Sequence, residues 1–241
     1  MSADDGSPGY DPGYDASADP HGPDVGNEGT ELRYRDLPHR FREAETLSEL
    51  VATIRAYGWP PVAVSLVVYG VSRGLFEYLS SPFSIANSYV FEAWPAALGI
   101  NVLFGLFFAG FSWFLYFGVI GAFAGFFAEG TAIDTGVFKT GGYLLLVFVP
   151  LLAISGLLAA TIPAAVAAGG GGSPRAAIEV QRSLDATVQM RVAGFLLAAG
   201  WVVVGFLLIP FVAELYDVSR KASVVSVLPP TLLAVLGTVL A

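Results

Sequence analysis

The chain has 241 residues, of which 55% are hydrophobic and only 13% are charged, about half the charged fraction of an ordinary soluble domain. Its net charge is −8 and it contains no cysteine. It therefore has no basic footprint for nucleic acid, and disulfides, zinc–thiolate sites and iron–sulfur clusters are excluded.

The negative charge belongs to the N-terminal segment. Residues 1–31 hold eight acids and no Lys or Arg, so the twelve remaining acids match the twelve bases of the rest of the chain. Gly, Pro, Asp and Ser dominate this stretch, which cannot bury enough apolar area to offset its ordering entropy. We predict a disordered acidic tail over residues 1–39. An acidic chain with ten Arg and only two Lys also indicates a halophilic, archaeal type of source.

Residues 40–58 are predicted to form an amphipathic helix that precedes the membrane. Apolar side chains recur at three- and four-residue steps from Phe41 to Ile54, as in a helix with one apolar face. Thr46 and Glu49 make a capping-box pattern, and Gly58 ends the periodic stretch. We expect this helix to lie on the membrane surface or against the bundle.

Five apolar runs follow, and a helix of about 20 residues crosses the hydrocarbon core of a bilayer. We therefore predict an all-α membrane protein in which residues 59–241 form a bundle of five transmembrane helices. The second run is too short to cross twice and would be about 50 Å long as one helix; the alternative is a helix preceded by an interfacial segment. The predicted spans are 61–79, 96–127, 142–167, 192–213 and 222–240.

The placement of Lys and Arg predicts the orientation, because cytoplasmic segments are enriched in these residues. With the N-terminus inside, eight basic residues lie inside and three outside. We therefore predict a multi-pass protein of the cell membrane with a cytoplasmic N-terminus and an external C-terminus. The inner residues are Arg33, Arg35, Arg40, Arg42, Arg55, Lys139, Arg220 and Lys221, and the outer ones are Arg175, Arg182 and Arg191.

No residue pattern typical of catalysis or of a cofactor site is found. His21 and His39 both precede the spans, so a Ser/His/Asp triad cannot form within the membrane and a histidine metal site would lack ligands. Residues 169–172 are four glycines without the Lys-Ser/Thr of a phosphate loop. We predict that the chain is not an enzyme and has no catalytic, cofactor-binding or metal-binding residues.

Arg73 is the one charge well inside a predicted span, and Glu77, four residues later, shares its helical face. Ionisable residues at such a depth are functional candidates. The alternative is that Arg73 pairs with Glu77 and extends toward the outer interface. A polar cavity that reaches Arg73 would favour transport, whereas a dry core would favour a scaffold.

Two further groups of residues are candidates. Gly118, Gly121 and Gly125 are spaced for close helix packing, either within the bundle or between copies. The predicted inner loops, 128–141 and 214–221, carry mixed charges that serve either solvation and topology or the docking of a cytoplasmic protein. The residues of this candidate cytoplasmic face are Asp134, Lys139, Asp217, Arg220 and Lys221.

Three features resemble the Yip1 family of membrane proteins over about residues 45–240. They are the segment 135–143 (TGVFKTGGY) followed by Pro150, the pair Gly200-Trp201 in the fourth span, and the segment 219–222 (SRKA) before the fifth. The resemblance implies five spans, with the N-terminus inside and the C-terminus outside. It brings no catalytic residues, and the trafficking role of eukaryotic members with small GTPases is not carried over.

Together these features predict a Yip1-like integral membrane protein that acts as a non-enzymatic scaffold or adaptor. Its expected partners are the lipid bilayer and other membrane or cytoplasmic proteins, without nucleic acid or cofactors. The alternative is a small transporter or channel component that uses Arg73 and Glu77.

Overall fold

The computed structural model describes residues 34–81, 84–86, 89–91, 93–128, 133–162 and 173–240, and only the backbone of 84–86 and 89–91. The chain divides into two units, Met1–Arg33 and Tyr34–Ala241. All the described residues belong to the second unit. Most of the predicted acidic tail, residues 1–33, lies outside them.

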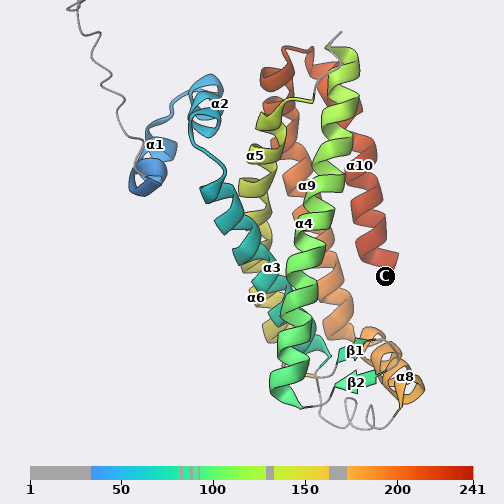
Figure 1. Cartoon of the computed structure of the whole chain (residues 1–241). Helices are drawn as coiled ribbons and strands as arrows, with labels where there is room; N and C mark the ends of the chain where they lie inside the picture. The colour runs from blue at the N-terminus through green and yellow to red at the C-terminus, as the bar shows by residue number, and fades with distance from the viewer. Residues whose placement is uncertain are drawn as a thin grey trace, which may run out of the picture. The chain divides into compact units, whose positions relative to one another are not determined.

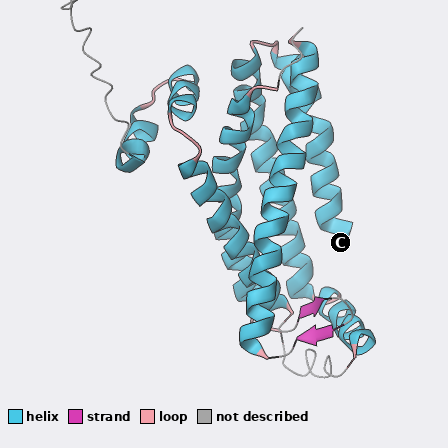
Figure 2. Cartoon of the chain, viewed as in Figure 1, coloured by secondary structure: helices cyan, strands magenta, loops and turns pink. Residues whose placement is uncertain are grey.

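The described part of the chain is helical except for one small hairpin (Figure 2). In the hairpin the two strands pair antiparallel, with Ile85 opposite Val90. The elements are η1 (Tyr34–Asp36), α1 (Leu37–Glu43), α2 (Leu47–Ala56), α3 (Pro60–Ser80), β1 (Ser84–Ala86), β2 (Tyr89–Phe91), α4 (Trp94–Phe127), α5 (Thr135–Leu144), η2 (Leu145–Val147), α6 (Phe148–Ala159), α8 (Pro174–Asp185), α9 (Val188–Tyr216) and α10 (Arg220–Leu240).

Five of the described helices are long and apolar enough to cross a membrane. This confirms the predicted all-helical fold with five such helices. The second apolar run is a single helix of 34 residues, α4, which begins with Pro in its first turn, where the missing N–H of proline has no helical partner to lose. The third span is α5, η2 and α6 in one continuous rod, Thr135–Ala159.

The third span begins seven residues earlier than the predicted residue 142. Asp134 caps its N-terminus, because its Oδ1 atom accepts a hydrogen bond from the Gly136 N–H at 2.6 Å. The sequence of this stretch predicts a loop. In the structure it is helical, and its glycines allow close contacts with neighbouring helices. A Cβ atom on Gly141 would lie 2.5 Å from the Phe117 ring, and one on Gly142 would lie 2.5 Å from Val62.

The predicted helix over 40–58 is divided into α1 and α2. Thr46 begins the second of them, since its Oγ1 accepts from the Glu49 N–H at 3.2 Å, as the capping pattern predicts. The carboxylate of Glu49 accepts in turn from the backbone N–H of Glu45 at 2.9 Å. These two hydrogen bonds start a new helix after Thr46, so α1 and α2 are separated by the non-helical residues 44–46.

The five long helices pack side by side as a bundle (Figure 1). Their most extensive contacts form a ring, and α4 also contacts α5 and α9. The order around the ring is α3, α4, α10, α9 and α6, and the contact between α4 and α10 is the least extensive of the five. Consecutive spans run in opposite directions. We name the end that carries α2 the α2 end, and the end that carries the hairpin and α8 the α8 end.

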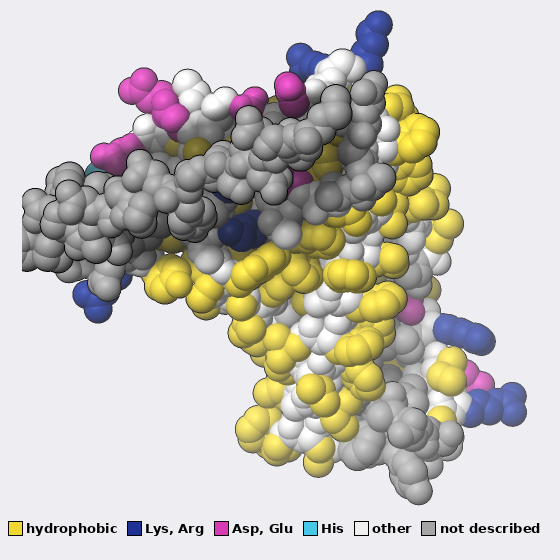
Figure 3. Space-filling view, turned by 45° about the horizontal axis from the view of Figure 1, so that its top comes forward, with side chains coloured by type: hydrophobic (Ala, Val, Ile, Leu, Met, Phe, Trp, Pro, Cys, Tyr) yellow, Lys and Arg dark blue, Asp and Glu magenta, His cyan; other side chains and the backbone are white. Residues whose placement is uncertain are grey.

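The outer surface of the ring is apolar in its middle. On the face drawn in Figure 3, hydrophobic side chains cover the bundle between charged groups that gather toward its ends. Phe107, Phe111 and Phe114 of α4 are each more than half exposed. A soluble surface rarely carries so continuous an apolar area, and a lipid environment accounts for it.

The closest helix approach joins α3 to α4 through three glycines. A Cβ atom on Gly105 would lie 2.4 Å from the carbonyl oxygen of Gly70 and 2.6 Å from the backbone nitrogen of Gly74. A Cβ atom on Gly74 would lie 2.4 Å from the Cα of Val102. Because these neighbours are backbone atoms, no side-chain movement can relieve the clash. In lipid, such small-residue contacts supply much of the attraction between helices.

We expect Gly105→Val to lower the free energy of unfolding by about 2 kcal/mol or more, because the branched side chain forces α3 and α4 apart. Gly110→Val is the matched control on the same helix, since no atom lies within 4 Å of a Cβ atom there. Unfolding in detergent, followed by circular dichroism, measures both variants. Equal losses in the two would contradict the close approach.

Candidate functional site

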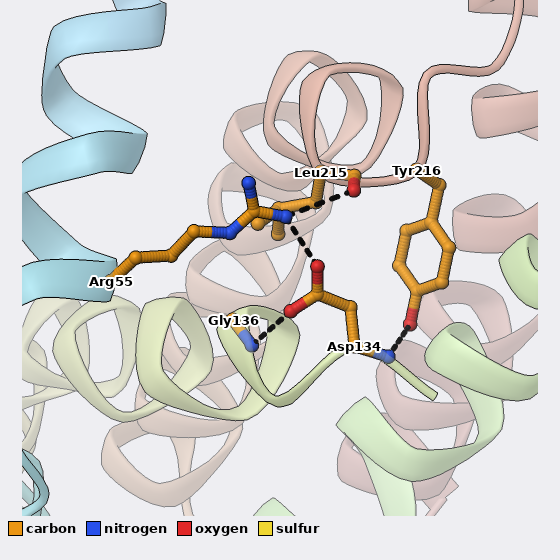
Figure 4. Close-up of polar contacts among 5 residues, drawn as sticks. All are labelled: Arg55, Asp134, Gly136, Leu215 and Tyr216. Carbon is orange, nitrogen blue, oxygen red and sulfur yellow. Dashed lines mark hydrogen bonds and ion pairs between the residues drawn. The ribbon is translucent and has the colours of Figure 1, made fainter. Parts of the chain in front are cut away.

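Asp134 joins three helices at the α2 end (Figure 4). Its carboxylate forms an ion pair with Arg55 in the last turn of α2, and Arg55 Nη2 also donates to the carbonyl oxygen of Leu215 at 3.2 Å. The backbone N–H of Asp134 donates to the hydroxyl of Tyr216 at 3.0 Å. These contacts connect α2, α5 and α9, and we call the five residues of Figure 4 the polar junction (Arg55, Asp134, Gly136, Leu215 and Tyr216).

Lys139 strengthens the same connection from the next turn of α5. Its Nζ donates to the carbonyl oxygens of Arg55 at 3.0 Å and Tyr57 at 2.7 Å, which end α2. A cation at a helix C-terminus satisfies free carbonyls and complements the helix dipole. The same ammonium lies 5.8 Å from the centre of the Trp59 ring. Lys139 is therefore a half-buried helical residue bonded to the end of α2, and its predicted position in a loop is wrong.

The residues of the candidate cytoplasmic face lie on two parts of the α2 end. Asp134 and Lys139 make the contacts described above, within the chain. The other three residues lie at the turn between α9 and α10, where Asp217 has a left-handed backbone with φ 50°. Arg220 and Lys221 are exposed at the start of α10. Cations oppose the dipole at a helix N-terminus, so their place there fits a topological role better than helix stability.

The predicted packing glycines lie on the face of α4 that meets α5 and α9. Gly121 is buried, and a Cβ atom on it would lie 2.6 Å from Ile133 and 3.0 Å from the Tyr216 hydroxyl. Gly125 is buried one turn later, whereas the Cβ of Gly118 would find ordinary contact with Phe138 at 3.6 Å. Gly121 and Gly125 therefore pack within the bundle.

Arg73 and Glu77 form an ion pair along α3, with Nε and Oε1 3.8 Å apart. The Arg73 side chain is 33% exposed and that of Glu77 is 47% exposed. The guanidinium carbon of Arg73 lies 5.6 Å from the centre of the Phe108 ring on α4. The distance between these atoms is longer than a direct hydrogen bond, so each group keeps hydrogen-bonding capacity for another partner.

Both charges line a cavity of about 940 Å³ inside the α8 half of the ring. Ligand pockets commonly have volumes of about 300–1,000 Å³. The walls come from α3, α4, α6, α9 and α10, and α8 adds two polar side chains. The polar lining consists of Arg73, Glu77, Ser80, Ser112, Gln181, Asp185, Arg191 and Thr238. Two arginines and two acids make its formal charge zero.

Aromatic rings form the deep wall of the cavity, toward the α2 end. The Trp201 ring lies 4.8 Å from both Tyr116 and Phe148, centre to centre, and Tyr69 lies 5.7 Å from Phe148. The Tyr116 hydroxyl is 2.7 Å from the hydroxyl of Thr231 and ties α4 to α10. Beyond this wall the core is closely packed, with Phe117 and similar side chains fully buried.

Sequence reasoning found Arg73 and Glu77 but missed their partners in the cavity. Asp185 and Arg191 stand before and at the start of α9, and they looked like ordinary loop and topology charges. A signal was present, however. Because consecutive spans alternate in direction, the end of the first span and the start of the fourth lie at the same face of the membrane. Asp185 and Arg191 are therefore expected near Glu77.

Among the described residues, no group of three or more His, Asp or Glu is arranged to hold a metal ion. Compared with protein-family models, with curated proteins and with solved structures, the chain matches none of them. The resemblance to the Yip1 family therefore stays a prediction. What the structure itself defines is a ring of five apolar helices with a charged cavity at one end and a polar junction at the other.

We expect Asp134→Ala to free α2 from the bundle, because it removes the ion pair and also the cap of α5, which is worth about 1 kcal/mol. Hydrogen exchange of the amides in 47–56 should accelerate. Asp134→Asn is the matched control, since asparagine caps a helix but carries no charge; it should give an intermediate rate. Unchanged exchange in Asp134→Ala would contradict a role of the junction in holding α2.

Proposed function

We propose that this chain is a multi-pass membrane protein that takes a small molecule into its cavity, as a transporter or channel component. The single observation that carries the proposal is the cavity of about 940 Å³ that reaches Arg73 and Glu77. Charged groups within an apolar ring are costly. Their place on a cavity wall supports a ligand-binding role over a purely structural one.

The alternative role, a scaffold that docks cytoplasmic proteins, has less support. Asp134 and Lys139 are two of its five candidate contacts, and both are occupied by bonds within the chain. The other three, Asp217, Arg220 and Lys221, lie at the turn between α9 and α10. The scaffold role is tested by affinity purification in mild detergent, which should recover a reproducible partner if it holds.

In the proposed orientation the α2 end is cytoplasmic and the cavity belongs to the external half of the cell membrane. The buried side chains around Phe117 and the polar junction then close the path from the cavity to the cytoplasm. Passage of a ligand would require α2, α5 and α9 to separate, which means breaking the contacts of Asp134. The balanced charges of the lining favour a neutral or zwitterionic ligand, and none of this chemistry requires the chain to be an enzyme.

The lack of cysteine makes the proposal directly testable. We expect a single cysteine at Ser112, which lines the cavity midway along α4, to react with a charged, membrane-impermeant methanethiosulfonate added from the α8 side. The rate should exceed that of Phe111→Cys by roughly tenfold, because the reactive thiolate forms only where water reaches it. Phe111 is the matched control, since it is 55% exposed but does not line the cavity.

The same labelling tests the closure at the α2 end. Ser112→Cys should not react from the α2 side in the otherwise native chain, but it should react from that side once Asp134→Ala is added. Equal rates for Ser112→Cys and Phe111→Cys from the α8 side would overturn the proposed water-filled cavity.

A further inference from the structure

We propose that the cavity is loaded from the bilayer, and that its occupant is a phospholipid with a zwitterionic headgroup. This inference rests on the proposed ligand-binding function and names its ligand. One acyl chain would enter between α4 and α10, and the headgroup would lie among the four charged side chains of the lining.

The apolar rim of the cavity supports entry from the side. Leu115 of α4, Phe195 of α9 and Leu233 of α10 all line the cavity, yet they are 53%, 65% and 71% exposed. A side chain that both lines a cavity and is this exposed lies at an opening. Leu115 and Leu233 flank the seam between α4 and α10, which is the least extensive contact of the ring. This opening lies along the apolar surface that faces lipid.

The cavity changes from polar to apolar along its length, as a lipid does. Glu77 and Arg73 lie three and seven residues before the end of α3 at Ser80, or about 5 Å and 10 Å along the helix axis. Both charges therefore lie near the α8 end of α3. Trp201 lies ten residues beyond Arg191 on α9, about 15 Å deeper, among aromatic and aliphatic side chains.

The charges of the lining match a headgroup that carries both signs. Arg191 and Arg73 can donate to a phosphate, and arginine does so in a bidentate manner. Glu77 and Asp185 can accept from an ammonium group. Among the described residues, Arg191 and Glu77 have no ion-pair partner closer than 3.8 Å, so their hydrogen-bonding capacity is available. A purely anionic headgroup would leave the two carboxylates facing a negative charge.

Trp201 provides the probe, because bromine atoms on an acyl chain quench tryptophan fluorescence on contact. The triple variant Trp59→Phe, Trp94→Phe, Trp113→Phe leaves Trp201 as the only tryptophan. We expect brominated phosphatidylethanolamine in liposomes to quench Trp201. At equal mole fraction, brominated phosphatidylglycerol should quench less.

Two pairs of matched variants decide the interpretation. Gly237→Phe fills the cavity, since its Cβ position is open and the residue lines the wall; it should abolish most of the quenching. Gly110→Phe adds the same ring on α4 outside the cavity and should change nothing. Glu77→Gln should reduce the preference for phosphatidylethanolamine by roughly fivefold, because it removes a carboxylate that would accept from the ammonium group. Glu179→Gln, which removes an acid from α8 away from the lining, should preserve the preference.

Quenching that survives Gly237→Phe, or no quenching at all, would overturn the lipid inference. Equal quenching by the two lipids would overturn the headgroup assignment. These failures are distinct from failure of the proposed function. If Trp201 is not quenched while Ser112→Cys reacts with the water-soluble reagent, the cavity takes a soluble ligand. If Trp201 is quenched and Ser112→Cys does not react with the reagent, the cavity holds lipid and is closed to water.

Discussion

The backbone contact between α3 and α4 fixes the geometry on which the rest of the bundle depends. Gly105 lies directly against Gly70 and Gly74, and helices in a bilayer gain little from hydrophobic burial against one another. Close approach must therefore supply the attraction through dispersion. With α3 held against α4 in this way, Arg73 and Glu77 face the interior rather than the lipid. The ring then closes on its other side at the less extensive seam between α4 and α10.

Charged side chains are paired at one end of the ring and line a cavity at the other. At the α2 end each charge of the polar junction has a partner of defined geometry, and Lys139 satisfies the carbonyls that end α2. At the α8 end the charges line a cavity, and the Arg73–Glu77 pair is long and partly exposed. Paired charges stabilise a fixed arrangement. Charged groups that lack a close partner keep hydrogen-bonding capacity that a ligand can use. This contrast is the physical basis for placing the ligand at one end and the closure at the other.

Several features could be predicted from local sequence because their cause is local. The length and hydropathy of each run predict a helix that can cross a membrane, and the capping pattern of Thr46 and Glu49 predicts the start of a helix. The third span shows the limit. Its first two turns contain Gly136, Lys139 and Gly141, which have low helix propensity or polar character and so favour a loop. Asp134 as cap, and contacts with Phe117 and Leu215, make the segment helical, and these partners are distant in sequence.

By itself, the sequence determined the number of helices long and apolar enough to cross a membrane and the shared face of Arg73 and Glu77, because helical periodicity and bilayer thickness act on neighbouring residues. Only the tertiary structure decided that Asp134 and Lys139 bond to α2, and that Asp185 and Arg191 join Arg73 around a cavity closed by Trp201 and Tyr116. Those residues come from different helices. Their meeting depends on which spans adjoin in the ring, and that order follows from glycine contacts that no periodicity within a single helix reveals.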